Sequence, residues 1–184
     1  KALQEYFRNH EVTAGEWERS QSVMFPILDQ YQRDGYGSLL KIAGKHGGAF
    51  LCDGVGLGKT FVGLMLIERL VVLERKKVIL VVPKSGREPV WETNLKQFLP
   101  HLFGDFSNLV VVNHTDLQRG GEWTERMRRL KEQADVLIID EAHHFRNPGT
   151  KGELSRYWRL FDLAEDKQVY MLTATPINNR LIDL

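Results

Sequence analysis

The sequence predicts an α/β fold in which helices cover both faces of a mostly parallel sheet. Short apolar runs alternate along the chain with longer segments of helical character, an order that requires right-handed crossovers between parallel strands. The run at 78–82, Val-Ile-Leu-Val-Val, contains no polar residue, which is typical of a parallel strand buried on both faces. A glycine-rich loop and an acidic pair each directly follow such a run. Because ligands bind at the carboxyl ends of parallel strands, both motifs fall where a site is expected.

The composition is that of an ordinary globular domain. The chain has 184 residues, of which 42% are hydrophobic and 27% charged, enough for one domain with a core. The net charge of +1 excludes a strong global attraction to nucleic acid, so a nucleic-acid surface must be a local patch. A single cysteine, Cys52, excludes a disulfide framework and fits a reducing compartment.

The sequence contains no apolar run of transmembrane length and no visible signal peptide. We therefore expect a cytoplasmic or nuclear protein without a membrane partner. The chain begins at Lys1 rather than at a methionine, and we expect it to be a piece of a longer protein.

The elements before the glycine-rich loop are expected as follows. Most of residues 1–24 are polar and mixed in charge, and they are expected to form a peripheral helical lead-in to a main domain at 25–184. A helix is expected at 31–44 and ends at Gly47-Gly48. The apolar run at 49–52 is the first expected strand.

The remaining elements follow the loop in alternation. The segment 61–73 is apolar almost all round and predicts a helix buried on more than one face. The segment 85–98 predicts a helix with its large apolar side chains on one side. A further helix is expected at 120–133. The strands are expected at 78–82, 109–112, 136–139 and 168–172.

The stretch 53–60, Asp-Gly-Val-Gly-Leu-Gly-Lys-Thr, has the character of a phosphate-binding loop. Glycines let several backbone N–H groups point at an anion, and the following helix adds its positive N-terminal end. Lys59 is expected to reach the outer phosphates, and the Thr60 hydroxyl to bind Mg²⁺. Asp53 stands where the usual pattern has its first glycine, and a turn without a ligand is the alternative. Backbone contacts to the nucleotide are expected from Gly54, Gly56, Leu57 and Gly58.

Asp140 and Glu141 follow the fourth expected strand. Mg²⁺ prefers hard oxygen ligands and keeps part of its hydration shell, so Asp140 can hold this ion, usually through water. Glu141 can polarise the water that attacks the terminal phosphorus. The alternative is that the pair only caps a helix. The occurrence of Gly58-Lys59-Thr60 at another strand end favours the chemical interpretation.

These motifs resemble those of a known family. Asp140-Glu141-Ala142-His143 resembles the DEAH box of superfamily-two helicases, and residues 53–60 are similar to the first motif of the Swi/Snf-type branch, Asp-Glu-Met-Gly-Leu-Gly-Lys-Thr. Asp53 matches that branch, whereas Gly54 and Val55 depart from its Glu-Met. Residues 172–179, Leu-Thr-Ala-Thr-Pro-Ile-Asn-Asn, are similar to the third motif, with Asn178 in place of the usual Gln.

Weaker matches extend the resemblance over about residues 25–179. Tyr31-Gln32 is similar to the motif whose glutamine reads adenine, and Trp91-Glu92 resembles the end of motif Ia. Residues 81–85 resemble the start of motif Ia, and residues 112–115 stand where motif Ib is expected.

The resemblance implies a RecA-like three-layer lobe that binds ATP and Mg²⁺ against a second RecA-like lobe of the same polypeptide. Family members track along double-stranded DNA without separating its strands, and an arginine finger on the second lobe assists ATP hydrolysis. The resemblance implies catalytic roles for Lys59 and Glu141 and adenine recognition by Gln32. A coupling role is expected for His143, by hydrogen bonding toward the segment that contains Thr173 and Thr175. The expected DNA contacts are Pro83, Lys84, Ser85, His114 and Arg146.

Two other functions stay open on the sequence alone. The same motor could belong to an unwinding helicase or to a restriction system, and elements outside this chain would decide between them. A nucleotide-binding scaffold without hydrolysis is the other, although Lys59, Thr60, Asp140 and Glu141 are all present. The basic stretch at 119–131 is ordinarily a solvated helix face, with a DNA contact as the alternative.

Overall fold

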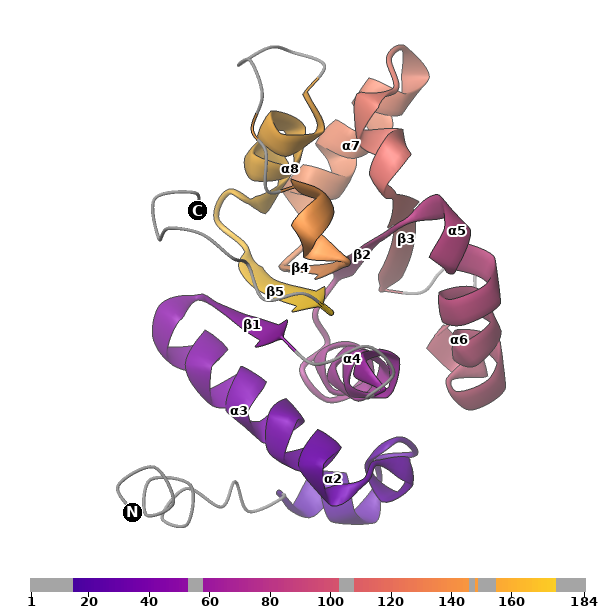
Figure 1. The fold of residues 1–184 in the computed structure, drawn as a ribbon, viewed down its shortest axis with the longest axis vertical. Coiled ribbons are helices and arrows are strands. Elements are labelled where there is room, and N and C mark those ends of the chain that lie inside the picture. Colours follow the sequence, from indigo (N-terminus) through magenta and orange to yellow (C-terminus); the bar gives the residue numbers. More distant parts are fainter. Residues whose placement is uncertain (1–14, 53–57, 103–107, 146–147, 149–154, 175–184) are drawn as a thin grey trace.

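The structure is a computed structural model that describes residues 15–52, 58–102, 108–145, 148 and 155–174 (Figure 1). Its centre is a five-stranded sheet with the order β1-β5-β4-β2-β3, in which every pairing is parallel. The predicted α/β class with a mostly parallel sheet is therefore confirmed. The strands are β1 (Gly48–Cys52), β2 (Val78–Val82), β3 (Leu109–Asn113), β4 (Val136–Asp140) and β5 (Gln168–Thr173).

Helices cover both faces of this sheet (Figure 1). The helices of one face are α3 (Gln30–His46), α4 (Lys59–Glu68) and α6 (Thr93–Phe98). Their side chains form one core cluster with Leu80, Ile138 and Leu172 of the sheet. The helices of the other face are α7 (Glu122–Gln133) and α8 (Arg156–Ala164). This second cluster contains Ile79 and Leu137. Neighbouring residues of one strand thus enter opposite cores, which explains why the strand sequences show no polar alternation.

Several short elements complete the described chain. The expected helix at 61–73 is α4 continued by a π-helical segment at Arg69–Leu73. The expected helix at 85–98 is α5 (Lys84–Gly86), a π-helical segment at Arg87–Glu92 and then α6. Helix α8 was not predicted. The other elements are α2 (Glu16–Ser20) and 3-10 turns at Phe25–Ile27, Pro100–Leu102, His114–Gln118 and Ala142–Phe145.

Hydrogen bonds and an ion pair connect the segment before the main domain to the end of α4 and to Arg69 after it. The buried Glu68 carboxylate accepts hydrogen bonds from the Ser22 hydroxyl at 2.6 Å and from the backbone N–H of Val23 at 2.7 Å. The buried Glu18 carboxylate pairs with Arg69 and accepts a hydrogen bond from Tyr36 at 2.8 Å. Residues 15–24 therefore pack against the domain, whereas residues 1–14 lie outside the described part of the chain. The boundary at residue 24 stays an expectation.

Candidate functional site

The candidate site lies at the carboxyl ends of β1, β4 and β5. Strand β1 ends at Cys52, and α4 begins at Lys59 after Gly58. Gly58 has a φ of 78°, a left-handed conformation that favours glycine. A Cβ atom at this position would stand 2.3 Å from Nε2 of Gln32, so a larger residue would also displace the end of that side chain. Lys59 and Thr60 thereby begin the helix, at the end whose partial charge is positive.

Some expected site residues lie outside the described part of the chain. They are Gly54, Gly56 and Leu57 of the loop, Arg146 after the acidic motif, and Thr175 of the third motif. Their expected roles stay predictions.

Both carboxylate oxygens of Asp140 accept hydrogen bonds. The Trp91 indole donates to Oδ2 at 2.7 Å, and the backbone N–H of Glu141 donates to Oδ1 at 3.0 Å. Burial raises the pKa of Asp140 above its ordinary value, whereas the Trp91 hydrogen bond and the charge of Lys59 act in the opposite direction. Lys59 begins α4 after β1 and Asp140 ends β4, so both residues stand at the carboxyl edge of the sheet.

Glu141 adopts a left-handed backbone conformation, with a φ of 50°. A non-glycine residue pays on the order of 1 kcal/mol for this conformation, and such residues cluster at functional sites. Its Oε2 atom lies 3.1 Å from Nδ1 of His143, which in turn lies 3.2 Å from the Thr173 hydroxyl on β5. The expected contact between His143 and the third motif is therefore present in the structure. The coupling role of this contact stays a prediction.

The oxygen atoms at this edge fit a magnesium site. Asp140 offers a carboxylate and Thr60 a hydroxyl, which are hard ligands, and Mg²⁺ in nucleotide sites takes its other ligands from phosphates and water. Among the described residues no group of three or more His, Cys, Asp or Glu side chains could hold a metal ion by itself.

Gln32 is engaged within the protein. Its Oε1 atom accepts the backbone N–H of Asp29 at 3.0 Å, as part of a capping box at the start of α3. Its Nε2 atom donates to the Tyr31 hydroxyl at 3.2 Å. Adenine recognition by Gln32 would therefore need an exchange of these hydrogen bonds, and it stays a prediction.

The prediction that the His114 side chain contacts DNA is wrong, because this side chain is buried. The ring is 3% exposed and donates from Nε2 to the backbone carbonyl of Asp140 at 2.9 Å. It also packs edge-on against Phe145, with ring centroids 4.7 Å apart. His114 therefore holds the backbone carbonyl of the acidic pair's first residue through a hydrogen bond. The sequence could not show this, because the partners are 26 residues apart.

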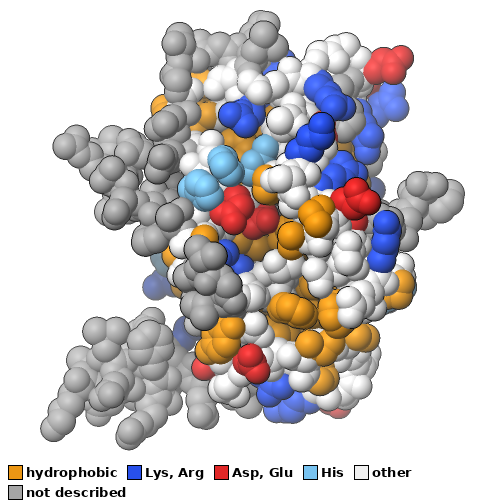
Figure 2. Space-filling view, turned by 45° about the vertical axis from the view of Figure 1, so that its right-hand side comes forward, with side chains coloured by type: hydrophobic (Ala, Val, Ile, Leu, Met, Phe, Trp, Pro, Cys, Tyr) orange, Lys and Arg blue, Asp and Glu red, His pale blue; other side chains and the backbone are white. Residues whose placement is uncertain are grey.

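The other expected DNA contacts lie after β2. Pro83 is half-buried at the start of α5, and Lys84 and Ser85 are exposed. Figure 2 shows histidine and acidic side chains side by side on one face, with Lys and Arg side chains gathered further along that face. A contact of these residues with DNA stays a prediction.

The buried His114 predicts a loss of stability in acid. Burial lowers its pKa from 6.5 to about 4, so the unfolded chain takes up a proton in a range where the native ring stays neutral. The free energy of unfolding should therefore fall by about 2 kcal/mol as the pH drops from about 6.5 to about 4. Denaturant titrations at about pH 7 and about pH 4.5 should show a smaller fall for His114→Gln, whose amide can still donate to Asp140.

The matched control for this prediction is His101→Gln, because His101 is exposed. The free energy of unfolding of His101→Gln should depend on pH in the same way as that of the wild type. If the free energy of unfolding fell by the same amount in acid for the wild type and for His114→Gln, His114 would not be the group responsible.

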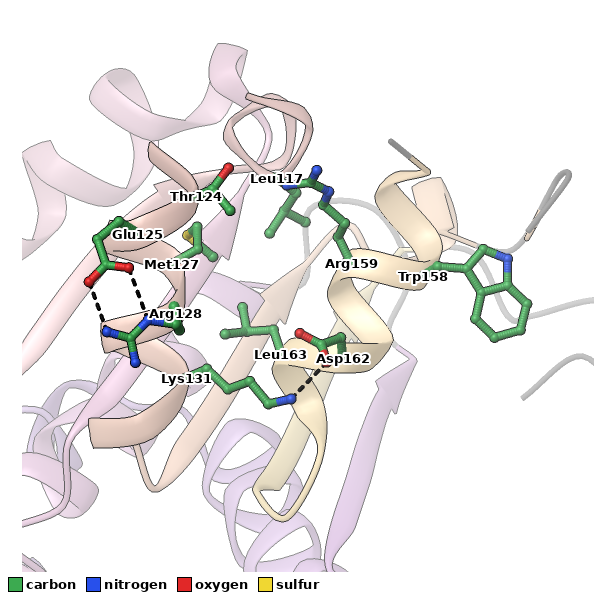
Figure 3. A pocket seen from close by; sticks show the side chains of 10 residues that line it. All are labelled: Leu117, Thr124, Glu125, Met127, Arg128, Lys131, Trp158, Arg159, Asp162 and Leu163. Atoms are coloured by element: carbon green, nitrogen blue, oxygen red, sulfur yellow. Dashed lines mark hydrogen bonds and ion pairs between the residues drawn. The ribbon is translucent and has the colours of Figure 1, made fainter. Parts of the chain in front are cut away.

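Side chains of α7 and α8, together with Leu117, line a groove (Figure 3). Leu117, Met127 and Leu163 contribute its apolar part, and Lys131 bridges the two helices through a 2.7 Å ion pair with Asp162. None of the expected site residues that the structure describes lines this groove. Glu125 of α7 pairs with both Arg128 and Arg129. This pairing partly neutralises the basic stretch at 119–131 and favours a solvated helix face.

The fold and the motifs at the strand ends define a helicase-like ATPase domain of RecA-like architecture. The chain belongs to the family described as type III restriction enzyme, res subunit, whose model matches residues 26–178. None of the described helices is long and apolar enough to cross a membrane.

Two curated relatives show the similarity in sequence. The uncharacterized ATP-dependent helicase YqhH of Bacillus subtilis is 34% identical over 146 residues, which are 76% of this chain and 25% of the relative. The RNA polymerase-associated protein RapA of Vibrio vulnificus is 32% identical over 145 residues, 68% of this chain and 15% of the relative. The chain thus spans a quarter or less of these proteins.

Two solved structures show the similarity in fold. The SWI2/SNF2 ATPase core of Sulfolobus solfataricus in complex with double-stranded DNA has a TM-score of 0.63 at 25% identity, covering 85% of this chain and 34% of that one. The core domain of the same organism, without DNA in its description, has a TM-score of 0.58 and covers 84% and 32%. The predicted relationship to the Swi/Snf-type branch of superfamily two is confirmed.

Proposed function

We propose that this chain is the N-terminal ATP-binding lobe of a motor that tracks along double-stranded DNA. One observation carries the proposal: Lys59 begins α4 after β1 and Asp140 ends β4, so a cation at a helix N-terminus and a pair of carboxylates stand at the same edge of the sheet. A cation at a helix N-terminus opposite paired carboxylates is the arrangement that Mg·ATP requires.

Each of these side chains has a distinct role in the proposed reaction. Thr60 and Asp140 would hold Mg²⁺, which supplies positive charge to the phosphate oxygens when it is bound. Lys59 binds the outer phosphates, and the Glu141 carboxylate orients the attacking water and accepts its proton. His143 contacts both Glu141 and Thr173, so it would transmit the state of the acidic pair to β5.

DNA and a second lobe enter the proposal from the comparisons. The Sulfolobus ATPase core is described in complex with double-stranded DNA, and this chain covers 34% of it. We infer that the rest of such a core would supply a second RecA-like lobe and with it an arginine finger. Exposed Lys84 and Ser85 after β2 would then contact the DNA backbone.

A motor of a restriction system is the second candidate. The family description, type III restriction enzyme, res subunit, favours it. This lobe would bind and hydrolyse ATP in the same way in both candidates. The two candidates would differ in the process that ATP hydrolysis drives. A scaffold without hydrolysis is disfavoured, because Lys59, Thr60, Asp140 and Glu141 are all present.

Lys59→Ala tests the proposed nucleotide site. Removing the amine deletes charge-assisted bonds to the phosphates, and we expect the dissociation constant for Mg·ATP to rise about tenfold to a hundredfold. Isothermal titration calorimetry on the purified chain measures it. Lys45→Ala is the matched control, because Lys45 is an exposed lysine near the end of α3. Equal affinities for the wild type and Lys59→Ala would reject this site.

A further inference from the structure

We propose that Trp91 is a positioning residue that orients the Asp140 carboxylate for the Mg²⁺ that accompanies ATP. This inference rests on the proposed function, because that function assigns Asp140 to the ion. The indole carries one N–H donor and no acceptor. In the structure this N–H donates a hydrogen bond to Oδ2 of Asp140 at 2.7 Å. The two residues are 49 positions apart in the sequence.

Trp91 is held in place on all sides. Its side chain is 0% exposed and belongs to the core cluster beneath α4 and α6. It lies in the π-helical segment Arg87–Glu92, which joins α5 to α6. A donor packed in the core fixes its acceptor more firmly than a solvent-exposed donor would, because the close-packed side chains around the indole restrict its orientation.

The ring also touches the helix that carries Lys59 and Thr60. A Cβ atom added to Gly63 of α4 would lie 2.6 Å from Cη2 of Trp91 and 3.1 Å from Cδ1 of Leu172. Gly63 therefore leaves the space that the indole fills. One rigid ring thus contacts α4 on one side and binds the carboxylate of β4 through its N–H, which sets the position of Asp140 relative to Thr60.

The two hydrogen bonds to Asp140 leave room for the ion. Trp91 takes one lone pair of Oδ2 and the Glu141 N–H takes one lone pair of Oδ1. Each oxygen keeps a second lone pair, so the carboxylate plane is fixed while it can still bind a hydrated cation. Partners that orient a metal ligand typically change metal affinity about 10-fold to 100-fold when they are removed.

Trp91→Phe tests the inference, because it removes the N–H and keeps most of the apolar ring. The concentration of Mg²⁺ that half-saturates ATP binding should rise about tenfold, while ATP affinity in excess chelator should stay unchanged. Calorimetric ATP titrations at a series of Mg²⁺ concentrations measure both quantities. Trp158→Phe in α8, on the other face of the sheet, is the matched control and should keep the wild-type response.

A second measurement follows the indole of the wild-type chain itself. Its indole N–H resonances can be observed with nitrogen-15 label, and the Trp91 resonance is the one missing from Trp91→Phe. This resonance should shift when Mg·ATP is added and stay in place with ATP and chelator, because the ion draws electron density from the acceptor carboxylate. Gly63→Ala, which displaces the ring without deleting the N–H, should also raise the Mg²⁺ requirement and serves if Trp91→Phe does not fold.

The outcomes separate the inference from the proposed function. If Asp140→Asn raises the Mg²⁺ requirement and Trp91→Phe does not, Trp91 only fills the core and the inference is overturned. If the wild type shows no Mg²⁺-dependent ATP binding, or Asp140→Asn leaves it unchanged, the proposed function fails first. A lower melting temperature of Trp91→Phe with an unchanged Mg²⁺ response likewise overturns the positioning role.

Discussion

In a protein that joins this chain to the proposed second lobe, Glu141→Gln is expected to bind Mg·ATP like the wild type and to lose about 10²–10⁴ in turnover. The amide is the same size as the carboxylate, so the strained backbone and the neighbouring contacts can persist. It cannot accept the proton of the attacking water. A steady-state ATPase assay with double-stranded DNA, combined with calorimetric ATP binding, separates the two effects.

The control for this experiment is a carboxylate away from the site. Glu88 is exposed in the segment before α6, and Glu88→Gln should hydrolyse ATP at the wild-type rate. Glu141→Gln that turns over as fast as the wild type would show that another group activates the water. A parallel loss of ATP binding would instead indicate that the substitution disturbs the nucleotide pocket.

The sheet and its motifs could be predicted because the relevant signals are local. Residues 78–82 form an unbroken aliphatic run that is mostly β-branched, and the structure has a strand over those residues with every side chain buried. Lys59 and Asp140 each stand beside a strand or helix end along the chain, so adjacency in sequence places them at one edge of the sheet.

The side-chain partners of the site could not be predicted in the same way. His114 and Trp91 reach Asp140 from segments 26 and 49 residues away. These contacts depend on how the segments after the strands pack over the sheet. The hydrophobic periodicity of the sequence predicts helices and strands but not such packing. His114 was expected to face DNA because its position in the sequence resembles a DNA-contacting motif, but burial and a hydrogen bond to the Asp140 carbonyl determine its orientation.

Helix α8 is a different case, because a local signal for it exists. Tyr157, Leu160 and Leu163 recur at intervals of three residues and pack against the second core cluster. The helix is short, and the exposed Phe161 interrupts its polar face. The pattern was therefore present, but weaker than that of the longer helices.

The second large effect concerns the second lobe that the proposed function requires. Residues 1–184 alone should bind Mg·ATP and show at most trace ATPase that double-stranded DNA does not stimulate. Phosphoryl transfer needs positive charge on the transition-state oxygens beyond what Lys59 and Mg²⁺ supply, and an arginine finger typically contributes about 10³–10⁵ in rate. By resemblance to the Swi/Snf-type family, that arginine lies on the second lobe.

The DNA response should depend on the second lobe for an electrostatic reason. This chain has a net charge of +1, and the basic side chains of α7 are partly neutralised by Glu125 and Glu132. Under the proposed function this chain supplies one side of the DNA-binding groove, and with so little excess charge it should release few counterions and bind DNA weakly at physiological salt. A protein that includes the second lobe should therefore regain both turnover and stimulation by double-stranded DNA. Robust DNA-stimulated ATPase by the isolated chain would show that its active site is complete without a second lobe.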